Sequence, residues 1–191
     1  MNMTGFVVAL VLAVVILGLA FIVLSTYNEI VGLAQRIDKA WANIDVALKQ
    51  RYDELPNLVE AVRGLMGFEQ SVLERVTQAR AGYRPEAPIP QQAATSEETS
   101  GAVKSLLATV ENYPDLTAHE NVMSLQAEIA RLEGVIADRR ELYNDMVYRY
   151  DARIQQLPAV LLASLLGWRP RPYFKAQPAE TAVPDTTLSP G

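Results

Sequence analysis

Residues 6–24 of the chain read FVVALVLAVVILGLAFIVL, an apolar run that only Gly18 interrupts. At about 1.5 Å per residue, a helix of this length spans roughly 28 Å, which matches the hydrocarbon core of a bilayer. No charged residue occurs before Glu29. The sequence therefore predicts a membrane-spanning helix within residues 1–27. The predicted span includes Phe6, Leu10, Val14, Gly18 and Leu24.

A cleaved signal peptide is the alternative for this segment. Such a peptide carries a basic start, a shorter apolar stretch and a small-x-small cleavage site. Residues 1–5 contain no Lys or Arg, and Leu24-Ser25-Thr26 is a poor cleavage site, so a permanent anchor is favoured. Because Arg36 and Lys39 follow the run and no basic residue precedes it, the N-terminus is expected outside and the rest of the chain in the cytoplasm.

A helical stripe continues directly from the apolar run. Apolar residues recur every three or four positions from Ile30 to Leu55, which predicts a helix with one buried face. Trp41 lies on this stripe, so core packing is favoured over a ligand-binding role. Asp53 and Pro56 then predict a turn, followed by a second helix that begins near Pro56.

The second half of the chain is predicted to hold one short and one long helix. Residues 84–101 contain three prolines and no aromatic residue, which predicts a loop. A capping box at residues 95–98 predicts the start of a short helix that ends before Pro114. A second capping box at residues 117–120 predicts a helix that extends to Leu157 and is about 60 Å long.

Stripes that cover one side of each helix must bury against one another, and no alternating strand pattern occurs. The predicted fold is therefore all-α, with a single N-terminal transmembrane helix that continues into an antiparallel up-and-down helical bundle. We expect an anchor at residues 1–27 and a cytoplasmic bundle at residues 28–174 that includes the loop 84–101. Residues 175–191, in which three prolines fall among Thr and Ala, are expected to be disordered.

Five motifs follow one another along the chain. They are Ala40-Trp41-Ala42-Asn43-Ile44-Asp45, LKQRYDELPNLV at residues 48–59, Glu111-Asn112-Tyr113-Pro114-Asp115-Leu116, Tyr143-Asn144-Asp145 and GWRPRPYF at residues 167–174. In this order they resemble the signature of the LemA family. The resemblance implies a bacterial single-pass protein of the cytoplasmic (inner) membrane with a cytoplasmic helical bundle and a role in membrane organisation or stress. It implies no enzymatic activity.

The residue inventory argues against catalysis and metal binding. The chain has no cysteine and one histidine, His119, at the predicted start of the long helix. This excludes thiol catalysis and Cys-ligated zinc, and leaves a metal only carboxylate-rich sites. No glycine-rich phosphate loop is present. A net charge of −5 argues against nucleic acid as a partner. We therefore expect no enzyme, no metal, no cofactor and no nucleic-acid partner.

One group of charged residues is a candidate docking surface. Asp45, Lys49 and Asp53 lie on one helical face at i,i+4 spacing, and Arg51 adds a charge near the predicted turn. These side chains either cap and staple the turn, which is favoured, or form a docking surface for a partner protein.

The end of the predicted bundle is rich in aromatic and basic residues. They are Trp168, Arg169, Arg171, Tyr173 and Phe174. Rings and arginines that follow a Leu-rich segment are typical of an interfacial membrane contact. The alternative, which is favoured, is that this segment folds back and closes one end of the bundle with its aromatic rings in the core.

Two functions remain open from the sequence. The first is a membrane-anchored scaffold or assembly protein that acts by protein–protein interaction or self-association. The second is a binding module for a small ligand or lipid held between the helices. A homo-oligomer is expected because the long predicted stripe ending at Leu157 outruns the short helix before it. The expected partners are thus membrane lipid, a second copy of the chain and an unidentified protein.

Overall fold

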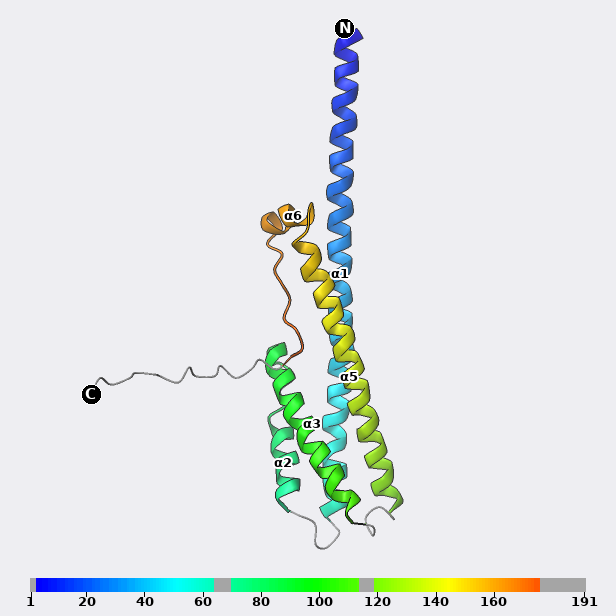
Figure 1. Cartoon of the computed structure of the whole chain (residues 1–191), viewed down its shortest axis with the longest axis vertical. Coiled ribbons are helices and arrows are strands. Elements are labelled where there is room, and N and C mark those ends of the chain that lie inside the picture. The colour runs from blue at the N-terminus through cyan, green and yellow to red at the C-terminus, as the bar shows by residue number, and fades with distance from the viewer. Residues whose placement is uncertain (1–2, 64–69, 114–118, 176–191) are drawn as a thin grey trace, which may run out of the picture.

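The computed structural model describes residues 3–63, 70–113 and 119–175, and every regular element in these ranges is a helix. The helices are α1 (Met3–Arg63), α2 (Gln70–Ala81), α3 (Ile89–Glu111), α5 (Glu120–Ile154) and α6 (Ala159–Leu166). In Figure 1, α1 runs along the whole molecule, and α2, α3 and α5 gather in up-and-down order around its C-terminal half. The predicted all-α fold, with a long apolar N-terminal helix that continues into packed antiparallel helices, is confirmed.

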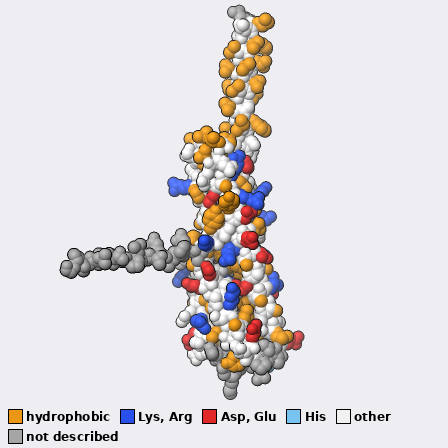
Figure 2. All heavy atoms as spheres, in the orientation of Figure 1, with side chains coloured by type: hydrophobic (Ala, Val, Ile, Leu, Met, Phe, Trp, Pro, Cys, Tyr) orange, Lys and Arg blue, Asp and Glu red, His pale blue; other side chains and the backbone are white. Residues whose placement is uncertain are grey.

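The N-terminal part of α1 stands clear of the other helices (Figures 1 and 2). All residues from 3 to 25 are exposed, and Thr26 is the first buried position. The mean hydropathy of the most apolar 18-residue window in this helix is 3.4. By length and composition the segment is a candidate membrane span.

The predicted turn at Asp53 and Pro56 is wrong, because α1 continues through Pro56 to Arg63. A proline inside a helix has no N–H for the carbonyl four residues before it, which here belongs to Tyr52. Arg80 of α2 supplies the missing donor, since its Nε donates to the Tyr52 carbonyl oxygen at 3.1 Å. A side chain from the neighbouring helix thus compensates for the proline.

Because α1 continues to Arg63, the second helix predicted from the sequence does not form one separate element in the described residues. Residues 58–63 belong to α1, residues 70–81 form α2, and residues 64–69 lie outside the described ranges. A helix across 64–69 therefore remains a prediction.

The predicted loop 84–101 is also wrong over most of its length, because α3 begins at Ile89. Pro88 is the N-cap residue and Pro90 lies in the first turn, where a helix tolerates a missing N–H. Residues 95–98 therefore lie inside α3 and do not form a capping box. The buried residues near the start of α3 are small or polar, which is why no apolar stripe marked the helix: Gln92, Ala93, Ser96 and Thr99.

The long helix lies close to its predicted limits. α5 begins at Glu120 after the N-cap residue His119, whose side chain makes no capping hydrogen bond. It ends at Ile154, three residues before the predicted end. Residues 117–118 of the predicted capping box and residues 176–191 of the predicted disordered tail lie outside the described ranges.

The core of the bundle lies mainly between α1 and α5, while α2 packs against α3 and α1. The stripe of α5 is buried along the helix, and its buried members are Val122, Ile129, Leu132, Ile136, Tyr143, Val147, Tyr150 and Ile154. α1 covers most of this stripe, while Met123, Leu142 and Tyr148 of α5 remain exposed beside it. The homo-oligomer stays a prediction. α3 and α5 face one another across a groove.

Candidate functional site

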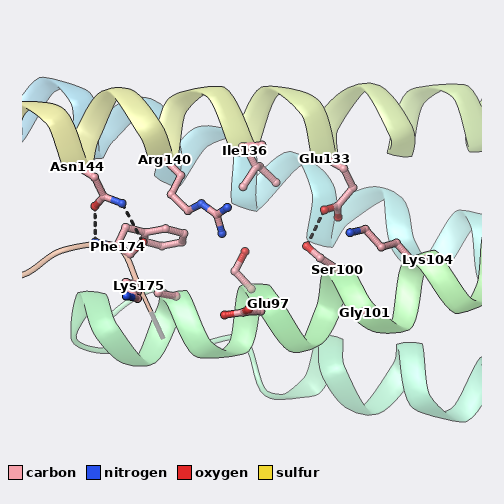
Figure 3. A pocket seen from close by; sticks show the side chains of 13 residues that line it. Glu97, Ser100, Gly101, Lys104, Glu133, Ile136, Arg140, Asn144, Phe174 and Lys175 are labelled. Carbon is pink, nitrogen blue, oxygen red and sulfur yellow. Dashed lines mark hydrogen bonds between the residues drawn. The ribbon is translucent and has the colours of Figure 1, made fainter. Parts of the chain in front are cut away.

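The groove between α3 and α5 has a volume of about 930 Å³ (Figure 3). One wall is formed by α3, the other by α5, and Phe174 and Lys175 close one end. Its lining residues are Ala93, Ser96, Glu97, Ser100, Gly101, Lys104, Glu133, Ile136, Ala137, Arg140, Asn144, Phe174 and Lys175. The site therefore combines small apolar positions with charged and hydroxyl side chains.

Arg51 of α1 lies beneath this groove and is fully buried. Its Nη1 donates to Glu133 Oε1 at 2.9 Å and to Ser100 Oγ at 3.0 Å. Its Nη2 donates to Ser96 Oγ at 3.0 Å and to the Tyr52 hydroxyl at 3.1 Å. One guanidinium group from α1 therefore binds side chains of both groove walls.

A direct hydrogen bond between the walls completes this network. Ser100 Oγ donates to Glu133 Oε2 at 2.6 Å, as the dashed line in Figure 3 shows. Polar contacts thus connect α3 to α5 where apolar packing is sparse. A buried arginine in such a network is costly to desolvate, so its carboxylate and hydroxyl partners are needed to hold it in place.

Not every buried polar atom in this region is paired. Within the described residues, Arg51 Nε and Gln92 Oε1 are buried and have no hydrogen-bond partner. Gln92 nevertheless stabilises the start of α3, because its Nε2 donates to the carbonyl oxygens of Pro85 and Ala87, each at 2.8 Å.

A stacked pair of tyrosines adjoins this network through the Tyr52 hydroxyl, which accepts from Arg51. The rings of Tyr52 and Tyr83 stack with centroids 4.0 Å apart, and the Tyr52 hydroxyl lies 3.1 Å from Thr99 Oγ1. Burial raises the pKa of the Tyr83 hydroxyl to about 12, and the nearby Asp45 carboxylate contributes to the shift. Tyr83 donates a hydrogen bond to this carboxylate at 3.5 Å.

We expect this tyrosine to affect stability at alkaline pH. The folded state holds the Tyr83 proton up to a pH of about 12, whereas an unfolded tyrosine loses it near pH 10. The contribution of Tyr83 to the free energy of unfolding is therefore complete below pH 10 and is lost as the pH rises towards 12. Absorbance titration of Tyr83→Phe should show one fewer phenol ionising near pH 12. Burial also raises the pKa of Tyr143 to about 12, so one phenol should still ionise there in this variant. An unchanged number of phenols ionising near pH 12 in Tyr83→Phe would contradict this assignment.

The charges that line the groove are unbalanced. Glu133 is paired with Arg51 at 2.9 Å. Among the described residues, Glu97, Lys104, Arg140 and Lys175 take part in no ion pair. Three cations therefore face one anion, and the groove carries an excess of positive charge in a protein that is negative overall.

The candidate docking residues do not act as one surface. Asp45 and Lys49 form an exposed ion pair at 2.6 Å, and Asp53 is exposed. Arg51 is fully buried, so its place in a docking surface must be corrected. Arg51 follows Leu48 by three residues and precedes Leu55 by four, which places it on the buried face of α1.

The aromatic end of the chain folds back along α1 and α5. Phe174 is buried against Trp41, with ring centroids 5.8 Å apart. Asn144 of α5 binds the backbone of Phe174 through both amide atoms, accepting from its N–H at 2.9 Å and donating to its carbonyl oxygen at 3.3 Å. Phe174 therefore closes the bundle and has no surface left for lipid.

The other residues of that end are divided between core and surface. Trp168 is half-buried beside Tyr27, with ring centroids 6.0 Å apart. The backbone N–H of Arg171 donates to Asp151 at 3.0 Å, while its side chain is exposed. Arg169 and Tyr173 are also exposed.

Sequence reasoning did not identify the groove residues on α3 and α5. Ser96, Ser100 and Glu133 carry the polar network, and Arg140 supplies an unpaired charge. The signal that could have identified them is Arg51, a charged residue that falls on the apolar stripe of α1. A buried arginine requires polar partners on the helices that pack around it. Within the described residues, no group of three or more His, Asp or Glu side chains is placed to hold a metal ion.

The sequence of the chain is similar to those of known proteins. A model of the LemA family matches residues 40–187, which include all the groove-forming helices. The chain is 25% identical to Magnetosome protein MamQ 2 of Paramagnetospirillum magneticum, over 92% of this chain and 75% of that protein. It is 25% identical to Magnetosome protein MamQ of Magnetospirillum gryphiswaldense, over 90% and 74% of the two chains. It is 23% identical to Protein LemA of Metamycoplasma hominis, over 87% and 77%.

Proposed function

The chain belongs to the LemA family, and we propose on that basis that it is a non-enzymatic, membrane-anchored scaffold whose groove between α3 and α5 binds a segment of a partner protein. The observation that carries the proposal is the groove itself, because three unpaired cations and one unpaired anion line an opening of about 930 Å³. A closed helical bundle would fill this space with side chains of its own.

The chemistry of the groove favours an acidic, amphipathic segment as its occupant. Ala137 offers an exposed apolar contact above the buried Ala93 and Ile136, while Lys104 and Arg140 offer charge on opposite walls. Helix-in-groove recognition combines an apolar face with complementary charges in this way. The segment belongs either to another cytoplasmic protein or to a second copy of the chain. In the second case, the groove would form the interface of the homo-oligomer that the sequence predicts.

We further propose that residues 6–24 span the cytoplasmic (inner) membrane of a bacterium, with the N-terminus outside and the bundle in the cytoplasm. The exposure of the whole run and its mean hydropathy of 3.4 support the span. Arg36 and Lys39 on the bundle side support the orientation. Relatives that are named magnetosome proteins support a role in membrane organisation.

The orientation leads to a direct prediction. Green fluorescent protein fused after Gly191 should fluoresce in cells, whereas alkaline phosphatase fused at the same place should be inactive, because it needs the oxidising periplasm for its disulfides. Both fusions should sediment with membranes. Phosphatase activity without fluorescence would reverse the proposed orientation.

Photocrosslinking from inside the groove tests the scaffold function. A photoreactive phenylalanine analogue at Ala137, which is exposed on the groove wall, should form protein adducts in native membranes. Ala127 is a matched control, because it is exposed on the same helix and does not line the groove. Adducts at both positions, or at neither, would contradict the proposal.

A small anionic ligand is the second candidate occupant. The groove volume of about 930 Å³ lies within the range of ligand sites, and the excess of cations suits an anion. Native mass spectrometry of the full chain released from detergent separates the two functions. A bound small molecule that is lost in Arg140→Glu, together with no protein adduct at residue 137, would favour ligand binding over scaffolding.

A further inference from the structure

The short helix α6 presents a leucine-rich surface that nothing in the described chain covers. Leu161 and Leu165, at i,i+4 spacing, are 66% and 79% exposed, and the preceding Leu157 is 73% exposed. Ala159 and Ala163 form the opposite face, and they are buried where α6 packs against α1 and α5. Such exposure of neighbouring leucines is unusual on a surface that faces water.

The position of α6 along α1 indicates what this surface meets. α6 lies beside α1 at the end of the bundle nearest the apolar run (Figure 1). Trp168, two residues after the end of α6, contacts Tyr27 at a centroid distance of 6.0 Å. Thr26 is the first buried residue of α1, and every residue from 3 to 25 is exposed. The leucine surface therefore lies at the level where the apolar run meets the bundle, and Figure 2 shows hydrophobic side chains gathered there.

We infer that α6 is a membrane-docking helix, whose Leu157, Leu161 and Leu165 enter the headgroup–acyl boundary of the leaflet from which α1 emerges. This inference rests on the membrane span proposed above. Exposed Arg169 lies three residues after the end of α6 and has no ion-pair partner among the described residues, which suits an anionic lipid headgroup.

The bilayer is a better occupant than a second protein because the leucine surface of α6 is continuous with the surface of the proposed span. The apolar surface of α6 adjoins the apolar surface of the proposed span, so lipid already surrounds its neighbour. An eight-residue helix alone would bind a membrane only weakly. The covalent link to the span holds α6 at the interface at a high effective concentration, which makes docking of a short helix favourable.

The absence of cysteine from the chain makes a depth measurement simple. Nitroxide spin labels would be placed on Leu161→Cys and Leu165→Cys in the full chain, reconstituted in vesicles of phosphatidylethanolamine and phosphatidylglycerol. Leu17→Cys reports on the span, and Leu142→Cys, 49% exposed on α5, reports on the aqueous side of the bundle. The readout is the accessibility of each label to oxygen, which concentrates in lipid, relative to a water-soluble nickel chelate.

Docking predicts an oxygen-to-nickel ratio at positions 161 and 165 that is several-fold higher than at 142 and lower than at 17. A water-like ratio at 161 and 165, with a lipid-like ratio at 17, would overturn the docking of α6 and leave the span intact. A water-like ratio at 17 would overturn the span and the docking together. Strong spin–spin broadening between labels at 165 on two copies would show a protein contact there and would also overturn the inference.

A charge variant provides an independent check. Leu161→Glu should lower the ratio measured at position 165 to the value at 142, because a carboxylate on this face opposes insertion. Leu142→Glu, at an exposed position on α5, should leave that ratio unchanged. Circular dichroism should show equal helix content in both variants, since both replaced side chains are exposed. No effect of Leu161→Glu on the ratio at 165 would contradict lipid docking.

Discussion

Replacing Arg51 with Ala should lower the free energy of unfolding by about 3–5 kcal/mol, the range found when one partner of a buried ion pair is removed. Arg51 is fully buried and binds Glu133, Ser96 and Ser100. Its removal leaves the Glu133 carboxylate without its cation and opens a cavity between α1, α3 and α5. Urea denaturation of the full chain in mild detergent, followed by circular dichroism, measures the change.

Two controls separate the network from general effects of losing an arginine. Arg131→Ala removes an exposed arginine whose ion pair with Glu128 lies on the outer face of α5, and it should change stability little. The double variant Arg51→Met with Glu133→Leu removes both charges and should cost less than Arg51→Ala, because no buried charge is left unpaired. Equal costs for Arg51→Ala and Arg131→Ala would contradict a stabilising role of the network.

The second large effect is expected at Arg80. Arg80→Ala should lower the free energy of unfolding by about 1–3 kcal/mol, the cost of a polar group left without its partner. The group concerned is the Tyr52 carbonyl, which receives the Arg80 Nε–H at 3.1 Å. Arg75→Ala is the matched control on α2, since Arg75 is exposed and forms no ion pair among the described residues.

A double-mutant cycle with Pro56 identifies the cause. In a Pro56→Ala background, the N–H of the new alanine can donate to the Tyr52 carbonyl in the ordinary helical manner. Arg80→Ala should then cost much less than it does beside Pro56. An equal cost in both backgrounds would show that Arg80 stabilises the protein by another route.

The same pair of residues explains why the turn at Pro56 was predicted wrongly. Local rules treat a proline as the end of a helix because it lacks a donor. The donor that replaces it comes from Arg80, which is 28 positions after the accepting Tyr52 in the sequence. Nothing near Pro56 in the sequence indicates this compensation. The all-α fold, in contrast, follows from apolar stripes of 3.6-residue period, which can be recognised within each helix alone.

The groove was missed for a related reason. The buried face of α3 carries Gln92, Ser96 and Thr99, which give no apolar period, so the sequence predicts a loop there. Each of them has a polar partner in the structure: Ser96 binds Arg51, Thr99 lies beside the Tyr52 hydroxyl, and Gln92 binds the carbonyl oxygens of Pro85 and Ala87. Each half of the network looks exposed when it is considered alone, so only the tertiary structure shows that they belong together.

The amino-acid composition of residues 157–174 does not decide whether this segment packs on the bundle or contacts lipid. Rings, arginines and leucines in residues 157–174 suit both closure of the bundle and contact with lipid. In the structure Phe174 closes the bundle, while Leu161 and Leu165 remain exposed beside the apolar run. The segment is divided because α6 ends at Leu166 and the following C-cap residue Gly167, with a φ of 71°, turns the chain back along α5.

The groove, the network beneath it and the proposed membrane anchor fit one arrangement. α1 is continuous from the apolar run to Arg63, so with the run in a bilayer it would hold the bundle at a set distance from the membrane. The network of Arg51 joins the three helices around the groove without filling it. A partner segment bound there would thus be held near the membrane surface.

The most direct test of this scaffold function is the yield of protein adducts from the photoreactive residue at position 137, measured in native membranes when the groove charges are reversed. Lys104→Glu with Arg140→Glu should abolish the adducts, because the double variant gives the groove an excess of negative charge against an acidic segment. Arg131→Glu with Arg149→Glu makes the same change of charge on the exposed surface of α5 and should leave the yield unchanged. Adducts that persist in the Lys104→Glu, Arg140→Glu chain at the original yield would contradict binding of a protein partner through this groove.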